Sequence, residues 1–110
     1  MTGWLRAFLL TVAVECPLVM VLTAQSRLPL ARRVCLVVAA QLMTHPLVWY
    51  AFPAIPSLPR FTTLVLSELW AFLAEGAFYA LVEVAPSRLA AFGISALANG
   101  ASLGLGFLIL

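Results

Sequence analysis

The chain has 110 residues, of which 65% are hydrophobic and only 9% are charged, and its mean hydropathy is +1.12. A soluble domain is about half apolar and about a quarter charged. The composition therefore indicates an integral membrane protein and leaves no room within these residues for a soluble domain. The net charge of +2 is small and the six arginines are dispersed, which argues against nucleic acid as a partner.

Four segments are long and apolar enough to cross a hydrocarbon core of about 30 Å, which takes about 20 helical residues. They cover residues 4–23, 34–52, 61–84 and 89–110. The connections between them are short, which places consecutive helices antiparallel and side by side. We predict that residues 1–110 form a single integral membrane domain, an all-α antiparallel bundle of four transmembrane helices.

Two prolines fall in the middle of predicted spans. Pro17 follows Glu15 and Cys16 in the first span, and Pro46 follows His45 in the second. A proline inside a helix removes one hydrogen bond and bends the helix, so we predict kinks at both positions. The kinks either shape the packing only, or free backbone carbonyls that line a cavity.

The arginines predict the orientation of the bundle. The first and third connections carry the larger share, and the opposite side carries the rest. The two sets are Arg27, Arg32, Arg33 and Arg88 against Arg6 and Arg60. Positive charge is retained on the cytoplasmic side. We therefore expect a protein embedded in the lipid bilayer of a plasma membrane, such as a bacterial inner membrane, with both termini facing outward.

All carboxylates of the chain, and its only histidine, lie in predicted spans. Glu15, Glu68, Glu75 and His45 fall well inside the hydrocarbon, whereas Glu83 lies at a span end, where we expect a surface ion pair with the nearby arginine. A charged side chain in the hydrocarbon costs about 2.5–3.5 kcal/mol, so an intramembrane ionisable residue is a functional-site candidate by default. We take the first four residues as candidates for binding a proton or a cation.

Polar residues share helix faces with these candidates. In the third span, Glu68, Glu75 and Tyr79 fall within a stripe about 40° wide. At 1.5 Å per residue, Glu15 and His45 each lie about 16 Å into their spans, near the midplane. Similar stripes on the other helices predict a polar interior and an apolar exterior. The supporting polar residues of this prediction are Thr11, Gln41, Tyr79, Ser95, Asn99 and Ser102.

Small residues recur four apart in the fourth span, at Ala96, Gly100 and Gly104. Such spacing lets two helices approach closely. The stripe predicts either an interface with a second copy or another membrane subunit, or close packing within the same bundle.

Transport is one function that fits this pattern. Desolvation near the midplane disfavours the ionised form of a glutamate, and neighbouring carboxylates disfavour it further. Such a group can hold a proton at neutral pH and exchange it for a cation. Glu15, Glu68 and Glu75 would be the carriers, and His45 would titrate with them or relay the proton.

The chain resembles the small multidrug-resistance exporters in its length, in its four predicted spans and in a glutamate, Glu15, midway along the first. Gly93 and Gly100 are spaced like the dimer contact in the fourth span of that family. The resemblance implies a stand-alone exchanger of protons for small cations or drugs. The two acids of the third span and the mid-span His-Pro pair are additional to the family's pattern.

Other readings remain open. The polar residues would also fix the register of a bundle that serves as an accessory or structural subunit of a larger membrane complex. Carboxylates with an imidazole suit a zinc, manganese or iron ion, although the Glu-x-x-His motif of di-iron bundles does not occur. We expect no other cofactor. We expect no enzyme, because the sequence shows no nucleophile spaced with a base.

Overall fold

The structure is a computed structural model that describes residues 3–51 and 53–109, without the side chains of Trp4 and Ile109. Every regular element among these residues is a helix. The helices are α1 (Gly3–Leu22), α2 (Leu30–Pro46), the short π-helical segment η1 (Leu47–Ala51), α3 (Arg60–Leu81) and α4 (Arg88–Ile109). The prediction of an all-helical chain with four long helices is confirmed.

Each long helix is apolar enough to cross a membrane. The four apolar stretches are 18–22 residues long and have mean hydropathies between 1.4 and 2.0. The second needs η1 to reach this length, since α2 alone has 17 residues and the stretch runs on to Ala51. Helix α1 passes through Pro17, and η1 follows directly after Pro46. A π-helical turn at such a place is a local departure from regular helix geometry.

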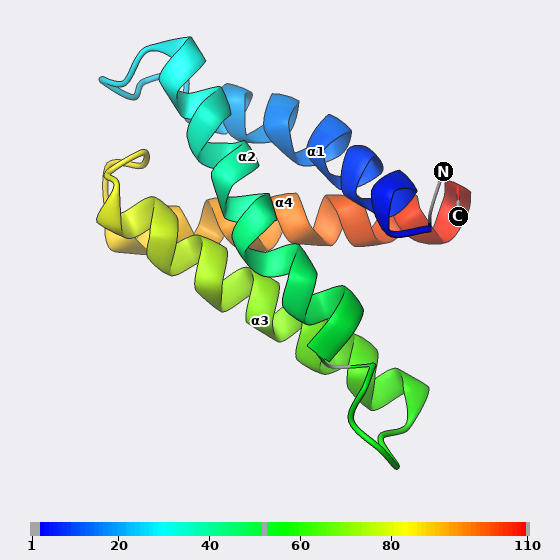
Figure 1. Cartoon of the computed structure of the whole chain (residues 1–110). Helices are drawn as coiled ribbons and strands as arrows, with labels where there is room; N and C mark the ends of the chain where they lie inside the picture. Colours follow the sequence, from blue (N-terminus) through cyan, green and yellow to red (C-terminus); the bar gives the residue numbers. More distant parts are fainter. Residues whose placement is uncertain (1–2, 52, 110) are drawn as a thin grey trace.

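The helices form two antiparallel hairpins, α1–α2 and α3–α4 (Figure 1). The connections within the hairpins, residues 23–29 and 82–87, lie at one end of the molecule, and the first turn of α1 and the last turn of α4 lie at the other. Helices α1 and α3 each pack on both α2 and α4, and α3 and α4 make the most extensive contact. Toward the end that carries the chain termini, the pair α1 and α4 diverges from the pair α2 and α3 (Figure 1).

A glycine permits the close contact between α3 and α4. A Cβ atom at Gly76 would lie 2.3 Å from Cδ1 of Phe92, so only glycine fits there without displacing the ring. The Phe92 ring also meets the edge of Phe72 at a centroid distance of 5.9 Å. Ser95 adds a hydrogen bond between the helices, from its Oγ to the carbonyl oxygen of Phe72 at 2.8 Å.

Helix α2 begins one turn earlier than the predicted second span, at Leu30 rather than Val34. Pro29 precedes the first turn with extended backbone angles, φ −60° and ψ 153°. Proline suits the start of a helix because the amide hydrogen that it lacks would have no partner inside the helix. Arg32 and Arg33 therefore belong to the helix, whereas Arg27 remains in the connection.

Helix α3 ends at Leu81, three residues before the predicted end. Glu83 adopts the left-handed conformation, with φ at 56°. The amide of Val84 donates to the carbonyl of Tyr79 at 3.2 Å, and the amide of Glu83 donates to that of Ala80 at 3.4 Å. These two bonds are those of the Schellman motif, which ends a helix and usually has glycine where this chain has Glu83.

Arg33 caps the end of α1. Its guanidinium is buried and donates from Nη1 to the carbonyl oxygens of Met20 and Thr23 at 3.2 and 3.1 Å, and to Oγ1 of Thr23 at 2.9 Å. Its Nε donates to the carbonyl of Leu28 at 3.1 Å. A positive charge at a helix C-terminus satisfies carbonyls that have no partner in the helix. The sequence suggested only a topological role for this residue.

An apolar core fills the bundle at the end where the two hairpin connections lie. All four long helices contribute to it. Its buried members are Val19, Val37, Ala40, Tyr79, Val84, Ala91, Ile94 and Ala98.

Candidate functional site: a carboxyl pair inside the bundle

Glu15 of α1 and Glu75 of α3 lie at the centre of the bundle, and neither has any exposed surface (0% each). Their carboxyl groups are within hydrogen-bonding reach of each other. Two ionised carboxylates repel each other and have no hydrogen to share. A hydrogen bond between them therefore needs one of the two carboxyl groups to be protonated.

Gln41 of α2 joins the two carboxyl groups. Its Nε2 donates to Oε1 of Glu15 at 2.8 Å and to Oε1 of Glu75 at 3.0 Å. One amide nitrogen thus uses both of its hydrogens to hold the acids of two other helices together.

The two remaining oxygens of the pair also accept hydrogen bonds. Ser102 of α4 donates to Oε2 of Glu15 at 2.8 Å, and Thr44 of α2 donates to Oε2 of Glu75 at 3.1 Å. Asn99 adds a longer bond to Oε1 of Glu75, at 3.4 Å. All four carboxyl oxygens are therefore hydrogen-bonded, and all four long helices contribute to the site.

A second set of bonds orients the groups that donate. Nδ2 of Asn99 also donates to the carbonyl oxygen of Ser95 at 2.9 Å and to its Oγ at 3.3 Å. Ser95, fully buried, is itself bonded across to α3. The carboxyl pair is thus held in place by a network that continues into the contact between α3 and α4.

A cavity of about 570 Å³ adjoins the pair. It extends from the network toward the end of the bundle that carries the chain termini, where the helix pairs diverge (Figure 1). Its polar lining comprises Thr11, Glu15, Gln41, Thr44, His45, Glu68, Glu75, Asn99 and Ser102. Its apolar walls include Trp49, Leu64, Leu103 and Phe107.

The apolar core closes the other side of the pair. Val19 lies one helical turn beyond Glu15, and Tyr79 lies one turn beyond Glu75, both toward the hairpin connections and both without exposed surface. The cavity and the core thus lie on opposite sides of the carboxyl groups.

His45 does not join the hydrogen-bond network. It is 7% exposed and lines the cavity, its ring meets the edge of Phe8 at 5.2 Å, and its buried Nδ1 has no partner. The sequence placed His45 at the level of Glu15, but Gln41 occupies that level. The helical stretch begins four residues earlier than predicted, so that Gln41 and not His45 lies about 16 Å from its start.

Glu68 and Thr11 line the cavity nearer the end of the bundle that carries the chain termini. Glu68 is half-buried, lies two turns from Glu75 on the same helix and has no hydrogen bond to the pair. Thr11 is half-buried one turn from Glu15. Among the described residues, neither has a hydrogen bond to the network.

Tyr79 lies in the apolar core, and its buried hydroxyl has no partner. It shares the helix face of Glu75, but it does not donate to that carboxyl group.

Thr44 was absent from the sequence prediction although it completes the network. Its place three residues after Gln41, on the same helix face, was the signal available for finding it.

The small residues of α4 face outward. Ala96, Gly100 and Gly104 are exposed, and a Cβ atom added at Gly100 or Gly104 would meet nothing within 4 Å. Packing within the bundle therefore does not account for this stripe.

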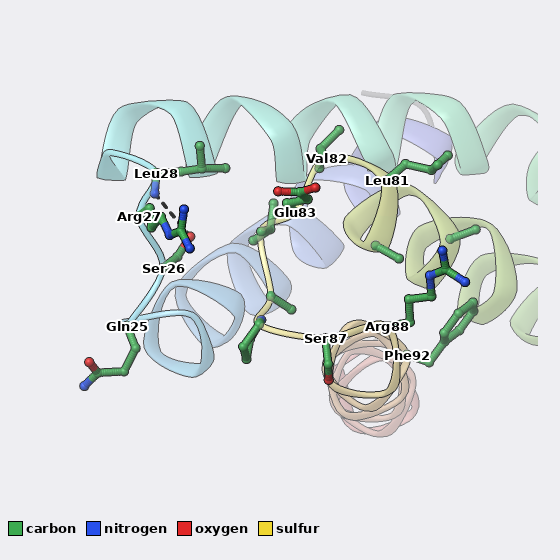
Figure 2. Close-up of a pocket in the computed structure, with 15 residues that line it drawn as sticks. Gln25, Ser26, Arg27, Leu28, Leu81, Val82, Glu83, Ser87, Arg88 and Phe92 are labelled. Atoms are coloured by element: carbon green, nitrogen blue, oxygen red, sulfur yellow. Dashed lines mark hydrogen bonds between the residues drawn. The ribbon is translucent and has the colours of Figure 1, made fainter.

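A wider hollow of about 1010 Å³ lies at the opposite end, between the two hairpin connections (Figure 2). Its charged lining residues, Arg27, Glu83 and Arg88, are all exposed. Figure 2 shows Glu83 and Arg88 pointing in different directions, and among the described residues no ion pair joins them, contrary to expectation. Because its charged groups are all solvent-exposed, this hollow is a less convincing site than the cavity.

Among the described residues, no three His, Cys or Glu side chains are grouped as metal ligands. No protein-family model matches the chain, and no curated protein or solved structure is significantly similar to it.

Proposed function

We propose that the chain is an integral membrane protein that exchanges protons for cations, with the Glu15–Glu75 pair as the shared binding site. The observation that carries this proposal is the pair itself. Two buried carboxyl groups lie close together on neighbouring hydrogen-bond donors, and both line a cavity that extends toward the end of the bundle with the chain termini. Buried ionisable groups of this kind mark ion and proton pathways in membrane proteins.

The exchange follows from charge balance. A cation that enters the cavity is attracted to the pair, and the shared proton is released as the second carboxyl ionises. Proton and cation therefore compete for the same oxygens. The groups that donate hydrogen bonds to these oxygens, above all Gln41, stay in place whether a proton or a cation is bound. Each exchange therefore needs little rearrangement of the site.

Transport also needs a state in which the site opens to the other side. We propose that the apolar core around Val19 and Tyr79 separates to admit the cation there. Kinks at Pro17 and Pro46 supply places at which α1 and α2 bend. Both termini face outward in this proposal, in a bacterial inner membrane, so that the cavity faces the exterior.

The test uses the purified protein in liposomes that enclose a pH-sensitive dye. A gradient of a test cation is expected to drive proton movement in the wild-type protein, and both Glu15→Gln and Glu75→Gln are expected to abolish it. Glu83→Gln is the matched control, because Glu83 is exposed and lies outside the network. Proton movement at the wild-type rate in both site variants would remove the carboxylate mechanism.

A second candidate function is that of an accessory subunit in a membrane complex, and the outward small-residue stripe of α4 favours it. Helices associate in lipid through such close contacts, and interhelical hydrogen bonds add about 0.6 kcal/mol on average. Native mass spectrometry of the gently solubilised protein separates the two functions. A homo-oligomer or a monomer fits the transporter, whereas a stable assembly with other subunits fits the accessory role.

A further inference from the structure

The charges around the cavity select a cation. Its titratable lining residues are Glu15, His45, Glu68 and Glu75, and no arginine lines it. The volume of about 570 Å³ lies within the range of about 300–1,000 Å³ that is typical of small-molecule sites. A bare metal ion would leave most of this space unfilled, whereas an organic cation would occupy it.

The carboxyl groups are arranged at two positions. The Glu15–Glu75 pair lies at the inner end of the cavity, and Glu68 lies two turns nearer the chain termini, about 10 Å further along the axis of α3. Ala71 lies on the same helix face between them, is buried and leaves room beside the helix. Two separated acidic positions match two basic nitrogens better than one.

The polar groups near the outer position lack donors. The carboxyl group of Glu68 is half-buried, lines the cavity and accepts no hydrogen bond from the described residues. His45 also lines the cavity, and its Nδ1 has no partner among the described residues. A carboxylate oxygen without a donor is free to accept a hydrogen bond from a ligand. Protonated primary amines carry N–H donors, whereas quaternary ammonium groups carry none.

Apolar side chains also line the cavity. Leu64 of α3 and Leu103 and Phe107 of α4 line the cavity beside the carboxyl groups. Methylene groups of a ligand would be buried against them, while its charged ends reach the acids.

We propose that the substrate of this site is a protonated aliphatic diamine, with one ammonium group at the Glu15–Glu75 pair and the other between Glu68 and His45. This inference rests on the proposed exchange function and names its substrate class. The inner ammonium displaces the shared proton, and the outer one neutralises Glu68, so that binding releases one proton from the pair.

The test compares three probes on the full chain in lipid nanodiscs, by calorimetry and by proton release into weakly buffered solution. Cadaverine carries two protonated amines, n-pentylamine carries one on the same carbon chain, and hexamethonium carries two charges without N–H donors. Cadaverine is expected to bind about tenfold more tightly than n-pentylamine, a difference of about 1.4 kcal/mol. Hexamethonium is expected to bind more weakly than cadaverine.

Variants of Glu68 test whether the outer position causes the preference for a ligand with two amines. Glu68→Gln is expected to reduce the ratio of cadaverine to n-pentylamine affinities to about one, and Glu68→Asp, which keeps the charge, is expected to retain a preference. Glu83→Gln is the control that keeps the wild-type ratio. Size-exclusion profiles of the variants establish that each is folded.

Two results would overturn the diamine inference alone. Equal wild-type affinities for cadaverine and n-pentylamine would show that the second acidic position is not used, and equal affinities for hexamethonium and cadaverine would show that N–H donors are not needed. If sodium ions still release a proton in a Glu15-dependent manner, the exchange function stands without diamines. If neither the amines nor sodium ions release a proton, the exchange function fails as well.

Discussion

The carboxyl groups of Glu15 and Glu75, sixty residues apart in the sequence, lie within hydrogen-bonding reach of each other inside the bundle. Their helices, α1 and α3, face each other across the bundle, because each of them packs on α2 and α4 (Figure 1). The pair thus connects the two hairpins at the centre, and Gln41 strengthens the connection by donating to both acids.

The first prediction concerns the coupling between these acids. Glu15→Gln and Glu75→Gln should each leave insertion and folding intact, because an amide has the same shape and donates the hydrogen that the protonated carboxyl supplies. The free energies of unfolding of the single and double variants should show a coupling of about 0.5–3 kcal/mol. Thermal or denaturant unfolding in detergent measures it.

The matched control is the cycle of Glu15→Gln with Glu68→Gln. Glu68 makes no hydrogen bond to Glu15, so this cycle should show a much smaller coupling. Additive effects in the Glu15 and Glu75 cycle would contradict a direct contact between the two carboxyl groups.

The second prediction concerns Tyr79. Its hydroxyl is buried without a partner, so Tyr79→Phe should leave stability unchanged or raise it by up to about 1–3 kcal/mol. Tyr79→Ala should instead lower the free energy of unfolding by about 3–5 kcal/mol, because it leaves a cavity in the apolar core. Melting temperatures in detergent compare the two variants.

Proton exchange provides an additional readout for Tyr79. The structure places it on the closed side of the carboxyl pair and not in the cavity, so Tyr79→Phe should bind cations and release protons as the wild type does. A lower stability of Tyr79→Phe would indicate that the hydroxyl has a partner after all.

The third prediction concerns the contact between α3 and α4. Gly76→Ala should lower the free energy of unfolding by about 1–3 kcal/mol, because the new methyl group would overlap the ring of Phe92. Gly93→Ala is the matched control on the facing helix, where a Cβ atom meets nothing within 4 Å. Equal stability of the two variants would mean that the Phe92 ring moves aside freely.

The fourth prediction concerns the end of α3. Glu83→Gly should stabilise the protein by about 1–2 kcal/mol, the approximate cost of the left-handed conformation for a residue with a Cβ atom. Val82→Gly is the control and should destabilise, since Val82 has φ at −90° and needs no glycine. A lower melting temperature for Glu83→Gly would show that its side chain makes a stabilising interaction that offsets this cost.

Most of the architecture could be predicted from local patterns. The lengths of the apolar stretches predict four helices, and the spacing of the polar residues predicts that Glu15, Gln41, Glu75 and Asn99 face inward, as they do. These features depend on composition and on the helical repeat, which act within one helix and are readable from the chain.

Which residues of different helices lie at the same depth along the bundle axis could not be predicted in the same way. His45 and Gln41 share one helix face, and a shift of one turn in the start of α2 decides which of them reaches the carboxyl pair. The guanidinium of Arg33 meets the end of α1 only because the hairpin folds back on itself.

Helical periodicity thus assigns each side chain to a face of its own helix, and the sequence alone suffices for that. The meeting of Glu15 with Glu75, the absence of His45 from their network and the position of the cavity follow from where the helices begin and how they cross. Those quantities are set by packing between helices, such as the contact at Gly76, and packing involves residues far apart in the sequence.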